Sequence, residues 1–366
     1  MTERFDVVVI GAGPAGSTAA RVAAEDGARV LLVDGARFPR YKTCGGGLIG
    51  TSLDLLPPAA LAAVERRAAT VSFSYRGRAA RRIRSERPFL ALVRREVLDQ
   101  ALVDAAVAAG AEFRDGTRVR AIEERADGVR LTGPGVEVQA AAVVGADGSA
   151  GVVGRWVGVR TARVDLGLEV ELAGTGDGWA DRVHLDWGRD AGTYGWVFPK
   201  GDRLTVGVIE RRGRGDATRA YLGRLVDELG LAGRERLHDS GHLTRWRETG
   251  SPVRRGRVLV AGDAAGLLEP WTREGISFAL RSGRAAGAAA ARAASDPHAL
   301  ADTALADYDR YVREELEPEQ RAGARLLRLF EHAPWLVHLG VTRSGRGASW
   351  FVRFARGEAS LARPRR

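Results

Sequence analysis

The chain has 366 residues, of which 45% are hydrophobic and 28% charged, and this composition is typical of a soluble globular protein with one large or two ordinary domains. The formal charge of +10 comes almost wholly from arginines scattered among acidic residues, so we do not expect nucleic-acid binding. One cysteine excludes an internal disulfide and fits a reducing compartment, and no apolar stretch is long enough to cross a bilayer. The first apolar run starts at Phe5 and leaves no room for a signal peptide, so we expect a cytoplasmic protein.

The first predicted elements form a nucleotide-binding unit. Residues 5–10 predict a buried strand, residues 15–26 an alanine-rich helix, and ARVLLVD a second strand, which together make a βαβ unit. GAGPAG places Gly11, Gly13 and Gly16 in the G-x-G-x-x-G spacing, where glycine permits the tight turn, the approach of a pyrophosphate and helix packing. Asp34 ends the second strand, where its carboxylate can accept both hydroxyls of an adenosine ribose. The alternative is an ordinary glycine-rich turn with a surface aspartate.

The next stretch, YKTCGGGLIG, contains Cys44 directly before three glycines. A structural cysteine is usually a small buried residue among larger ones, whereas glycines let a ligand or another backbone come close. We therefore expect Cys44 beside a bound cofactor, with its thiol either donating a proton or only packing there. An inert buried cysteine is the ordinary alternative.

The middle of the chain changes from helices to strands. We expect a helix around residues 53–67 that Pro57 and Pro58 break near its start, strands over residues 70–93 with the basic tract RRIRSER, and a helix over 95–111 closed by Gly110. Short strands follow to Gly145. From about residue 164 to 210, apolar residues alternate with period two between Gly/Asp turns, which predicts an antiparallel sheet.

An aromatic stripe lies within that predicted sheet. Tyr194, Trp196 and Phe198 are spaced by two, so they share one face of a strand. Aromatic faces attract cationic charge and are apolar enough to line a tunnel for a hydrocarbon chain. The alternative is an ordinary core stripe.

The chain then returns to a buried strand, GRVLVAGDAAG, which ends at Gly262 and places Asp263 at its end. A carboxylate there can hold a ribitol hydroxyl, and a helix starting near Gly275 suits the negative N1/O2 edge of a reduced flavin, which favours FAD over NAD. Helices and a basic tail complete the chain. Peripheral contact with an anionic membrane is one interpretation of the mixed aromatic and basic side chains there, and packing on the protein itself is the other; they are Trp335, Trp350, Phe351, Phe354, Arg343, Arg346, Arg353 and Arg356.

GAGPAG, RREVLDQAL, GADGS and GDAAG occur in the order seen in FAD proteins of the para-hydroxybenzoate hydroxylase-like fold. YKTCGGGL resembles the cysteine–glycine loop of the geranylgeranyl reductase family, and YGWVFPKGDRLTVGV resembles its aromatic signature; the resemblance covers about residues 5–287. It implies that the following residues bind non-covalent FAD: Gly11, Gly13, Ala15, Gly16, Asp34, Cys44, Gly45, Gly46, Arg95, Val119, Asp147, Gly262, Asp263, Gly275 and Ile276. It also implies catalytic roles for Cys44, Tyr194, Trp196 and Phe198, and no metal.

The same resemblance implies an α/β fold. A Rossmann-like FAD-binding domain (1–70, 94–160 and 250–300) would be interleaved with an antiparallel-sheet substrate domain (71–93 and 161–249), followed by a C-terminal helical region (301–366). The implied activity is reduction of carbon–carbon double bonds in a hydrophobic prenyl or lipid-like chain, with hydride from the flavin N5 atom. The sequence has no second dinucleotide motif, so we expect NAD(P)H, ferredoxin or a deazaflavin to bind transiently as electron donor.

One segment departs from the family, because PWTREG places Trp271 and Arg273 where bulk would be added beside the flavin. An FAD-dependent monooxygenase or halogenase acting on a small aromatic or natural-product substrate is therefore the alternative function. Halogenases of this fold carry a second tryptophan and an isoleucine before the proline, and GWVFP lacks both. A flavoprotein that only carries or senses a lipid is the remaining alternative.

Overall fold

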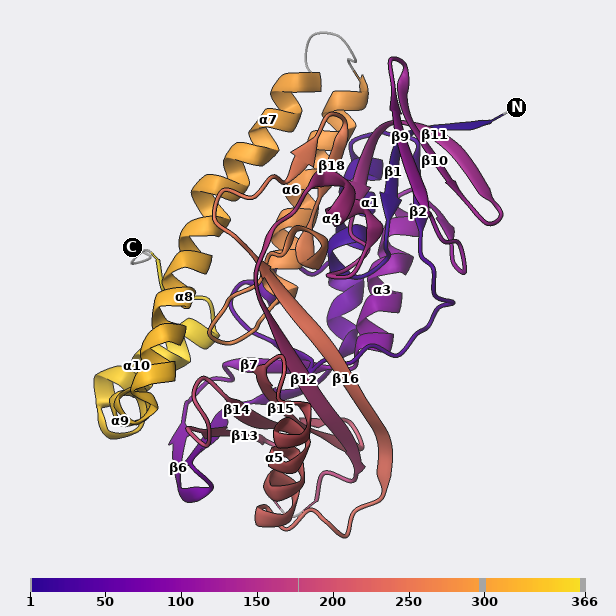
Figure 1. The fold of residues 1–366 in the computed structure, drawn as a ribbon. Coiled ribbons are helices and arrows are strands. Elements are labelled where there is room, and N and C mark those ends of the chain that lie inside the picture. The colour runs from indigo at the N-terminus through magenta and orange to yellow at the C-terminus, as the bar shows by residue number, and fades with distance from the viewer. Residues whose placement is uncertain (1, 177, 296–300, 363–366) are drawn as a thin grey trace.

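The computed structural model describes residues 2–176, 178–295 and 301–362. Residues 296–300 of the predicted FAD-binding segment and 363–366 of the predicted basic tail lie outside this description, as do residues 1 and 177. The described chain forms two lobes, each built on a large sheet, with the C-terminal helices running along one side of both (Figure 1). The predicted α/β class is confirmed.

The N-terminal lobe contains the nucleotide-binding sheet, whose strands have the order β17-β18-β11-β1-β2-β8. All neighbours on this path are parallel except β17 and β18, and a hairpin of β9 and β10 extends from β11. The strands are β1 (Glu3–Ile10), β2 (Val30–Val33), β8 (Glu112–Arg114), β9 (Ala121–Arg125), β10 (Gly128–Gly133), β11 (Val136–Gly145), β17 (Arg254–Arg255) and β18 (Val258–Val260). Strands buried on both faces explain the continuous apolar runs in the sequence.

Helices α1 (Pro14–Glu25), α3 (Arg95–Ala108), α4 (Val152–Val157) and α6 (Ile276–Ser295) belong to the same lobe. Their small residues allow close packing of α1 on α6. A Cβ atom at Gly283 would lie 2.2 Å from the Ala15 carbonyl oxygen, and one at Gly287 would lie 2.3 Å from that of Ala19. The alanine- and glycine-rich sequence of α6 is therefore a packing requirement, since larger side chains would separate the two helices.

The second lobe contains a seven-stranded sheet with the order β16-β12-β15-β14-β13-β5-β6. Helix α5 (Gly215–Glu228) covers one face and buries Tyr221 and Leu225 against Val197 and Val206. Strands β12 and β16 are long enough to link both lobes (Figure 1). The strands are β5 (Thr70–Tyr75), β6 (Arg78–Arg84), β12 (Thr161–Ala173), β13 (Arg182–Trp187), β14 (Tyr194–Lys200), β15 (Arg203–Arg211) and β16 (Arg236–Arg247).

The expectation of a wholly antiparallel sheet was wrong at one position, because β5 and β13 pair in parallel from Thr70↔Arg182 to Tyr75↔Trp187. These strands are more than 100 residues apart, so no hairpin constrains their relative direction. The other strand pairs of this sheet are antiparallel.

A third, smaller sheet has the strand order β3-β7-β4. Its strands are β3 (Gly47–Leu48), β4 (Val64–Ala68) and β7 (Leu90–Val93). The helix predicted over residues 53–67 is wrong. The structure has a short α2 (Ser52–Leu55), a 3-10 helix η1 (Pro58–Ala63) and then β4, which pairs with β7. Leu56 and Pro57 are extended, with ψ of 139° and 149°, because a residue that precedes proline is disfavoured in the helical region.

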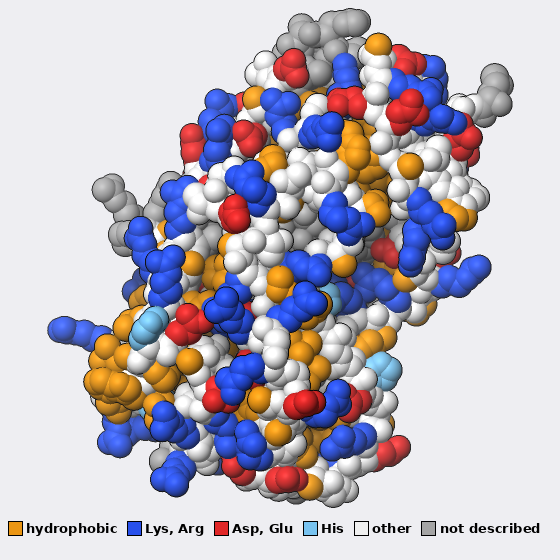
Figure 2. Space-filling model, viewed as in Figure 1, with side chains coloured by type: hydrophobic (Ala, Val, Ile, Leu, Met, Phe, Trp, Pro, Cys, Tyr) orange, Lys and Arg blue, Asp and Glu red, His pale blue; other side chains and the backbone are white. Residues whose placement is uncertain are grey.

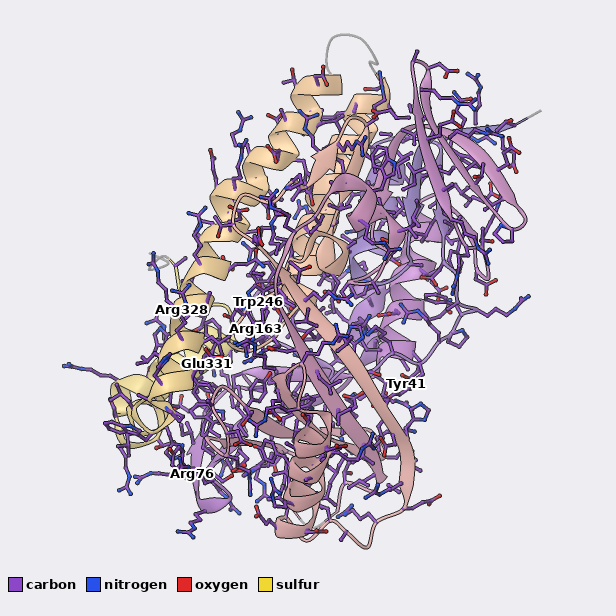
Figure 3. All side chains as sticks on the ribbon, in the orientation of Figure 1. Tyr41, Arg76, Arg163, Trp246, Arg328 and Glu331 are labelled. Atoms are coloured by element: carbon purple, nitrogen blue, oxygen red, sulfur yellow. The ribbon has the colours of Figure 1, made fainter. Side chains whose placement is uncertain are left out.

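The C-terminal helices are α7 (Ala301–Tyr311), a π-helical turn η3 (Val312–Leu316), α8 (Glu317–His332), α9 (Pro334–Arg343) and α10 (Gly345–Ala355). Buried polar contacts attach α8 to the rest of the molecule. Arg247 of β16 pairs with Glu317 at 3.4 Å. Arg163, Trp246 and Glu331 gather where the long strands meet α8 (Figure 3). No helix among the described residues has the length and hydropathy needed to span a membrane.

The Arg247–Glu317 pair gives a stability prediction. Their side chains are 1% and 3% exposed, so Glu317→Ala leaves a buried guanidinium without its counter-charge and should lower the free energy of unfolding by about 3–5 kcal/mol. Glu248→Ala is the matched control, because the Arg160–Glu248 pair is 54% and 49% exposed and should contribute about 0–1 kcal/mol. Denaturant unfolding measures both, and equal losses would contradict the structural role given to the buried pair.

Candidate functional site

A cavity of about 730 Å³ is lined by segments from both lobes. The nucleotide-binding turn, the Cys44 loop and the start of α6 form one part of its wall, and one face of the seven-stranded sheet forms another. The predicted residues that line it are Gly11, Gly13, Ala15, Asp34, Cys44, Gly45, Gly46, Arg95, Val119, Asp147, Tyr194, Trp196, Phe198, Asp263, Gly275 and Ile276. Residues from distant parts of the sequence therefore meet around a single space.

Two predicted cofactor residues, Gly16 and Gly262, lie behind this wall. A Cβ atom at Gly16 would be 1.7 Å from the Gly11 carbonyl oxygen, so its glycine serves the turn of the βαβ unit. Gly262 has a φ of +56°, and a Cβ atom there would lie 2.8 Å from Cβ of Ala15. Both positions support the site through backbone packing.

Two arginines flank the glycine-rich turn where a pyrophosphate would lie. A Cβ atom at Gly13 would be 3.6 Å from a terminal nitrogen of Arg40 and 3.9 Å from one of Arg95. Buried Asp99 orients both guanidinium groups, with two hydrogen bonds of 2.8 Å from Arg95 and one contact of 3.0 Å to Arg40. Arg40 Nη1 is buried without a partner among the described residues. These guanidinium groups fit a diphosphate, because its oxygens can accept two parallel hydrogen bonds from one planar guanidinium group.

Three aspartates mark the rest of the predicted cofactor path. Asp34 accepts hydrogen bonds from the amides of Ala12 and Ala36, both at 2.8 Å, and so fixes the turn beside the expected ribose. Asp147 Oδ2 accepts from Val152 N at 2.6 Å and caps α4, while burial raises the pKa of this carboxyl. The Oδ1 atom of Asp263 is 3.3 Å from where a Cβ atom at Gly275 would lie.

The three glycines after Cys44 pack against the aromatic stripe of β14. A Cβ atom at Gly45 would be 3.0 Å from Trp196 Nε1, and one at Gly47 would be 3.2 Å from Phe198 Cε2. Gly46 has a φ of +71°, and a Cβ atom there would be 2.1 Å from the Val93 carbonyl oxygen. The glycines therefore let the loop come close to other protein atoms on both sides. This packing holds the loop at the cavity wall.

The stripe itself depends on a residue that the sequence analysis missed. Tyr194, Trp196 and Phe198 share one face as predicted, with ring centroids 5.8 and 6.5 Å apart. Gly207 of the neighbouring strand provides the space for Trp196, because a Cβ atom there would be 2.1 Å from the indole ring. The period-two pattern of β15 would have identified Gly207 as the partner facing the stripe.

Buried charged residues hold the backbone of Cys44. Its amide donates to Glu169 Oε1 at 2.8 Å, and Lys200 Nζ donates to its carbonyl oxygen at 3.1 Å. Glu169 and Lys200 are each 2% exposed, and burial raises the pKa of the Glu169 carboxyl. The sequence analysis missed Glu169, although LGLEVEL places acidic side chains at alternate positions in an otherwise apolar strand, which was the available signal.

Polarity changes across the sheet face that lines the cavity. Strands β16 and β12 contribute His242, Thr244 and Glu169, whereas β13 and β5 contribute only apolar side chains. Burial and the charge of Lys42 lower the pKa of His242 to about 4, so its imidazole is neutral at pH 7. The aromatic stripe of β14 lies between these two regions. The apolar lining residues are Val71, Val183, Leu185 and Trp187, with Phe351 and Phe354 from α10.

The bulky residues of PWTREG occupy separate environments. Trp271 packs in the apolar region, with its ring centroid 6.1 Å from that of Trp187 and 6.2 Å from that of Phe354. Arg273, which has a φ of +56°, pairs with buried Asp165 at 3.0 Å. Its charge is therefore neutralised within the protein, while Trp271 adds an apolar surface to the cavity.

Comparisons with known proteins agree with this geometry. A family model for the FAD binding domain matches residues 4–174. Digeranylgeranylglycerophospholipid reductase 1 of Methanopyrus kandleri is 32% identical over 332 residues, covering 85% of this chain and 86% of the relative. A geranylgeranyl bacteriochlorophyll reductase-like protein from Thermoplasma acidophilum has a TM-score of 0.80 at 22% identity, covering 90% and 88% of the two chains. A flavin-dependent brominase has a TM-score of 0.77 at 20% identity, covering 97% and 94%, which shows a shared fold alone.

The fold and the cavity define an FAD-dependent oxidoreductase. The glycines of the turn, the paired arginines and the buried polar atoms that have no hydrogen-bond partner among the described residues fit FAD. The chain belongs to the geranylgeranyl reductase family of flavoproteins, as the cysteine–glycine loop and the aromatic stripe predicted.

The packing of the glycine loop predicts different effects for two neighbouring substitutions. Gly46→Val places a side chain against the Val93 carbonyl at a positive φ, so the purified protein should have lost most of its FAD. Cys44→Ser keeps the loop backbone and should retain FAD at the parental ratio. The flavin absorbance per mole of protein measures both. Equal FAD retention in the two variants would contradict the position given to this loop.

Proposed function

We propose that the protein reduces carbon–carbon double bonds in a prenyl chain of a lipid-like substrate. The observation that carries this proposal is the single cavity whose wall changes from charged groups and glycine turns to aromatic and aliphatic side chains. Bound FAD, once reduced, supplies a hydride from its N5 atom. The relatives named for digeranylgeranylglycerophospholipid reduction support a substrate of this class.

The residues of the chain would perform three tasks in this reaction. The apolar region around Trp187, Trp271 and Phe354 would bind the hydrocarbon chain and exclude water. The faces of Tyr194 and Trp196 would stabilise the positive charge that develops on the tertiary carbon of the double bond. The loop at Cys44 would close the cavity wall next to the cofactor.

An external donor must reduce the cofactor between turnovers. The sequence contains one dinucleotide-binding motif, so NAD(P)H, ferredoxin or a deazaflavin would bind transiently. Anaerobic mixing of the oxidised protein with each donor, followed at the flavin absorbance, identifies the one that reduces it.

The function is tested with dithionite-reduced protein and polyprenyl compounds in the absence of oxygen. Reoxidation of the flavin together with a product two mass units heavier than the substrate supports the proposal. The monooxygenase or halogenase alternative predicts a different result. The flavin would stay reduced with every alkene, and a substrate would be hydroxylated or halogenated once oxygen is added.

The aromatic stripe should control the alkene step. Trp196→Ala removes the ring that faces the glycine loop, so flavin reoxidation by a prenyl substrate should slow by about tenfold or more, corresponding to about 1.4 kcal/mol of lost transition-state stabilisation. Flavin reduction by the donor should change little. Trp179→Ala is the matched control, since Trp179 is 4% exposed in the core beneath α5 and away from the cavity lining. A silent Trp196→Ala would show that the stripe is only structural.

We also propose peripheral contact with an anionic membrane through the outer face of α8 and α9. Leu329, Trp335, Leu336 and Leu339 are 42–54% exposed and are four of the eight large apolar side chains that the described residues leave exposed. Figure 2 shows apolar side chains gathered over α9 with arginines around them. The sequence prediction had included Phe351 and Phe354, but these line the cavity, and Trp350 stacks on Phe354 at 5.3 Å.

The membrane proposal predicts a specific loss. Trp335→Glu combined with Leu336→Ser places a charge and a hydroxyl on the exposed face, so binding to vesicles of anionic phospholipid should fall several-fold in a sedimentation assay. Leu61→Ser combined with Val107→Ser, at positions 41% and 47% exposed elsewhere, is the control and should bind as the parent does. Equal sedimentation of both double variants would refute the contact.

A further inference from the structure

Reduction of an unactivated double bond consumes a proton as well as a hydride. Water should be excluded from the apolar region of the cavity, so a group of the protein must deliver that proton. We propose that the carboxyl group of Glu169 donates it and that the Tyr41 hydroxyl returns it from the surface. This inference rests on the proposed function and assigns the proton-donating step to a residue outside the aromatic stripe.

The position of Glu169 suits a group that delivers a proton into the cavity. The side chain comes from β12, is 2% exposed and lines the cavity. Cys44 N and Tyr41 OH both donate to Oε1, at 2.8 and 3.0 Å, which leaves Oε2 to carry a proton. Because burial raises the pKa of this carboxyl, its acid form persists to higher pH than that of an exposed glutamate.

Tyr41 connects this carboxyl with the edge of the sheet. Its hydroxyl lies 3.1 Å from Ser240 Oγ on β16, the edge strand, and its ring lies 3.9 Å from that of exposed His238. Figure 3 shows Tyr41 beside β16 at the outside of the lobe. A carboxyl, a phenol and a serine hydroxyl thus form a hydrogen-bonded chain from the cavity toward solvent. No pattern in the sequence indicates this position of Tyr41, because Glu169 and Ser240 are 128 and 199 residues away.

Neighbouring charges act on Glu169 in opposite directions. Burial raises its pKa most. The ammonium group of Lys200 and the hydrogen bonds from Cys44 N and Tyr41 OH lower the pKa, and the carboxylate of Glu171 raises it. Lys200 in turn contacts Glu171 at 3.9 Å and donates to the Cys44 carbonyl, so its charge is shared. The Cys44 thiol accepts a hydrogen bond from Gly46 N at 3.4 Å, within its own loop. Cys44 would therefore pack at the wall while Glu169 donates.

The π bond of the alkene breaks, one carbon gains a hydride from the reduced cofactor, and the other gains the proton of Glu169. The alkene is reduced by two electrons, the cofactor is oxidised, and Glu169 becomes a carboxylate. A solvent proton reaches Oε1 through Ser240 and Tyr41, and rotation of the carboxyl group then presents the protonated oxygen to the cavity. NAD(P)H, ferredoxin or a deazaflavin restores the electrons.

Glu169→Gln tests the proposal, because glutamine keeps the shape and can still accept from Cys44 N but cannot donate an acidic proton. Single-turnover alkene reduction should fall by about 10²–10⁴ while flavin reduction by the donor stays within a few-fold of the parent. The parental alkene step should slow as pH rises through the raised pKa of Glu169, and the variant should lose this dependence. Glu210→Gln is the matched control and should leave the alkene step unchanged, since Glu210 is 2% exposed on the neighbouring strand β15, is paired with Arg214 and does not line the cavity.

Tyr41→Phe tests the relay separately. Its first turnover should match that of the parent within a few-fold, whereas later turnovers should slow because Glu169 regains its proton slowly. If Glu169→Gln fails to bind FAD, Tyr41→Phe still tests the proposal. Steady-state turnover of Tyr41→Phe as fast as that of the parent would then overturn it. With FAD retained, a Glu169→Gln rate and pH profile like those of the parent would overturn it. A parent that reduces no alkene would instead refute the proposed function.

Discussion

The site depends on the absence of side chains between the Cys44 loop and strand β14. Gly46 lies against the backbone of β7, where a methyl group would displace the loop, and Gly45 and Gly47 lie so close to Trp196 and Phe198 that a methyl group would have to push the stripe by a few tenths of an ångström. Lys200 and Glu169 fasten the same loop by its backbone atoms. This contact joins a loop of the nucleotide-binding lobe to the sheet of the other lobe, and it brings the cofactor cradle and the apolar region into one cavity.

The cavity has two kinds of wall. The glycine turn, the paired arginines and the start of α6 form the polar part. The aromatic stripe, the apolar side chains of β13 and β5, and Phe351 and Phe354 of α10 form the other part. Helices α8 and α9, which pack beside α10, carry the exposed apolar residues outside. The same helical segment therefore forms a wall of the substrate region on its inner side and, as we propose, meets the membrane on its outer side.

The sequence predicted the features that depend on local pattern. The βαβ unit, the period-two strands and the common face of Tyr194, Trp196 and Phe198 follow from spacing alone. Features that depend on distant partners were missed or wrong. β4 is a strand because β7 lies beside it, and β5 is parallel to β13 because no turn joins them. The ion pair that Arg273 makes at the cavity wall was missed, because its partner Asp165 is 108 residues away. Glu169 has a role only because the Cys44 loop reaches it.

The central claim is that one cavity holds the cofactor over its polar wall and a prenyl chain over its aromatic and apolar wall. A crystal structure of the protein with FAD and a bound prenyl alcohol tests this most directly. We expect the isoalloxazine ring near His242, Glu169 and the start of α6, with the prenyl chain lying between Trp196 and Trp271. A prenyl chain bound outside this cavity, or a flavin ring occupying the region around Trp187 and Trp271, would contradict it.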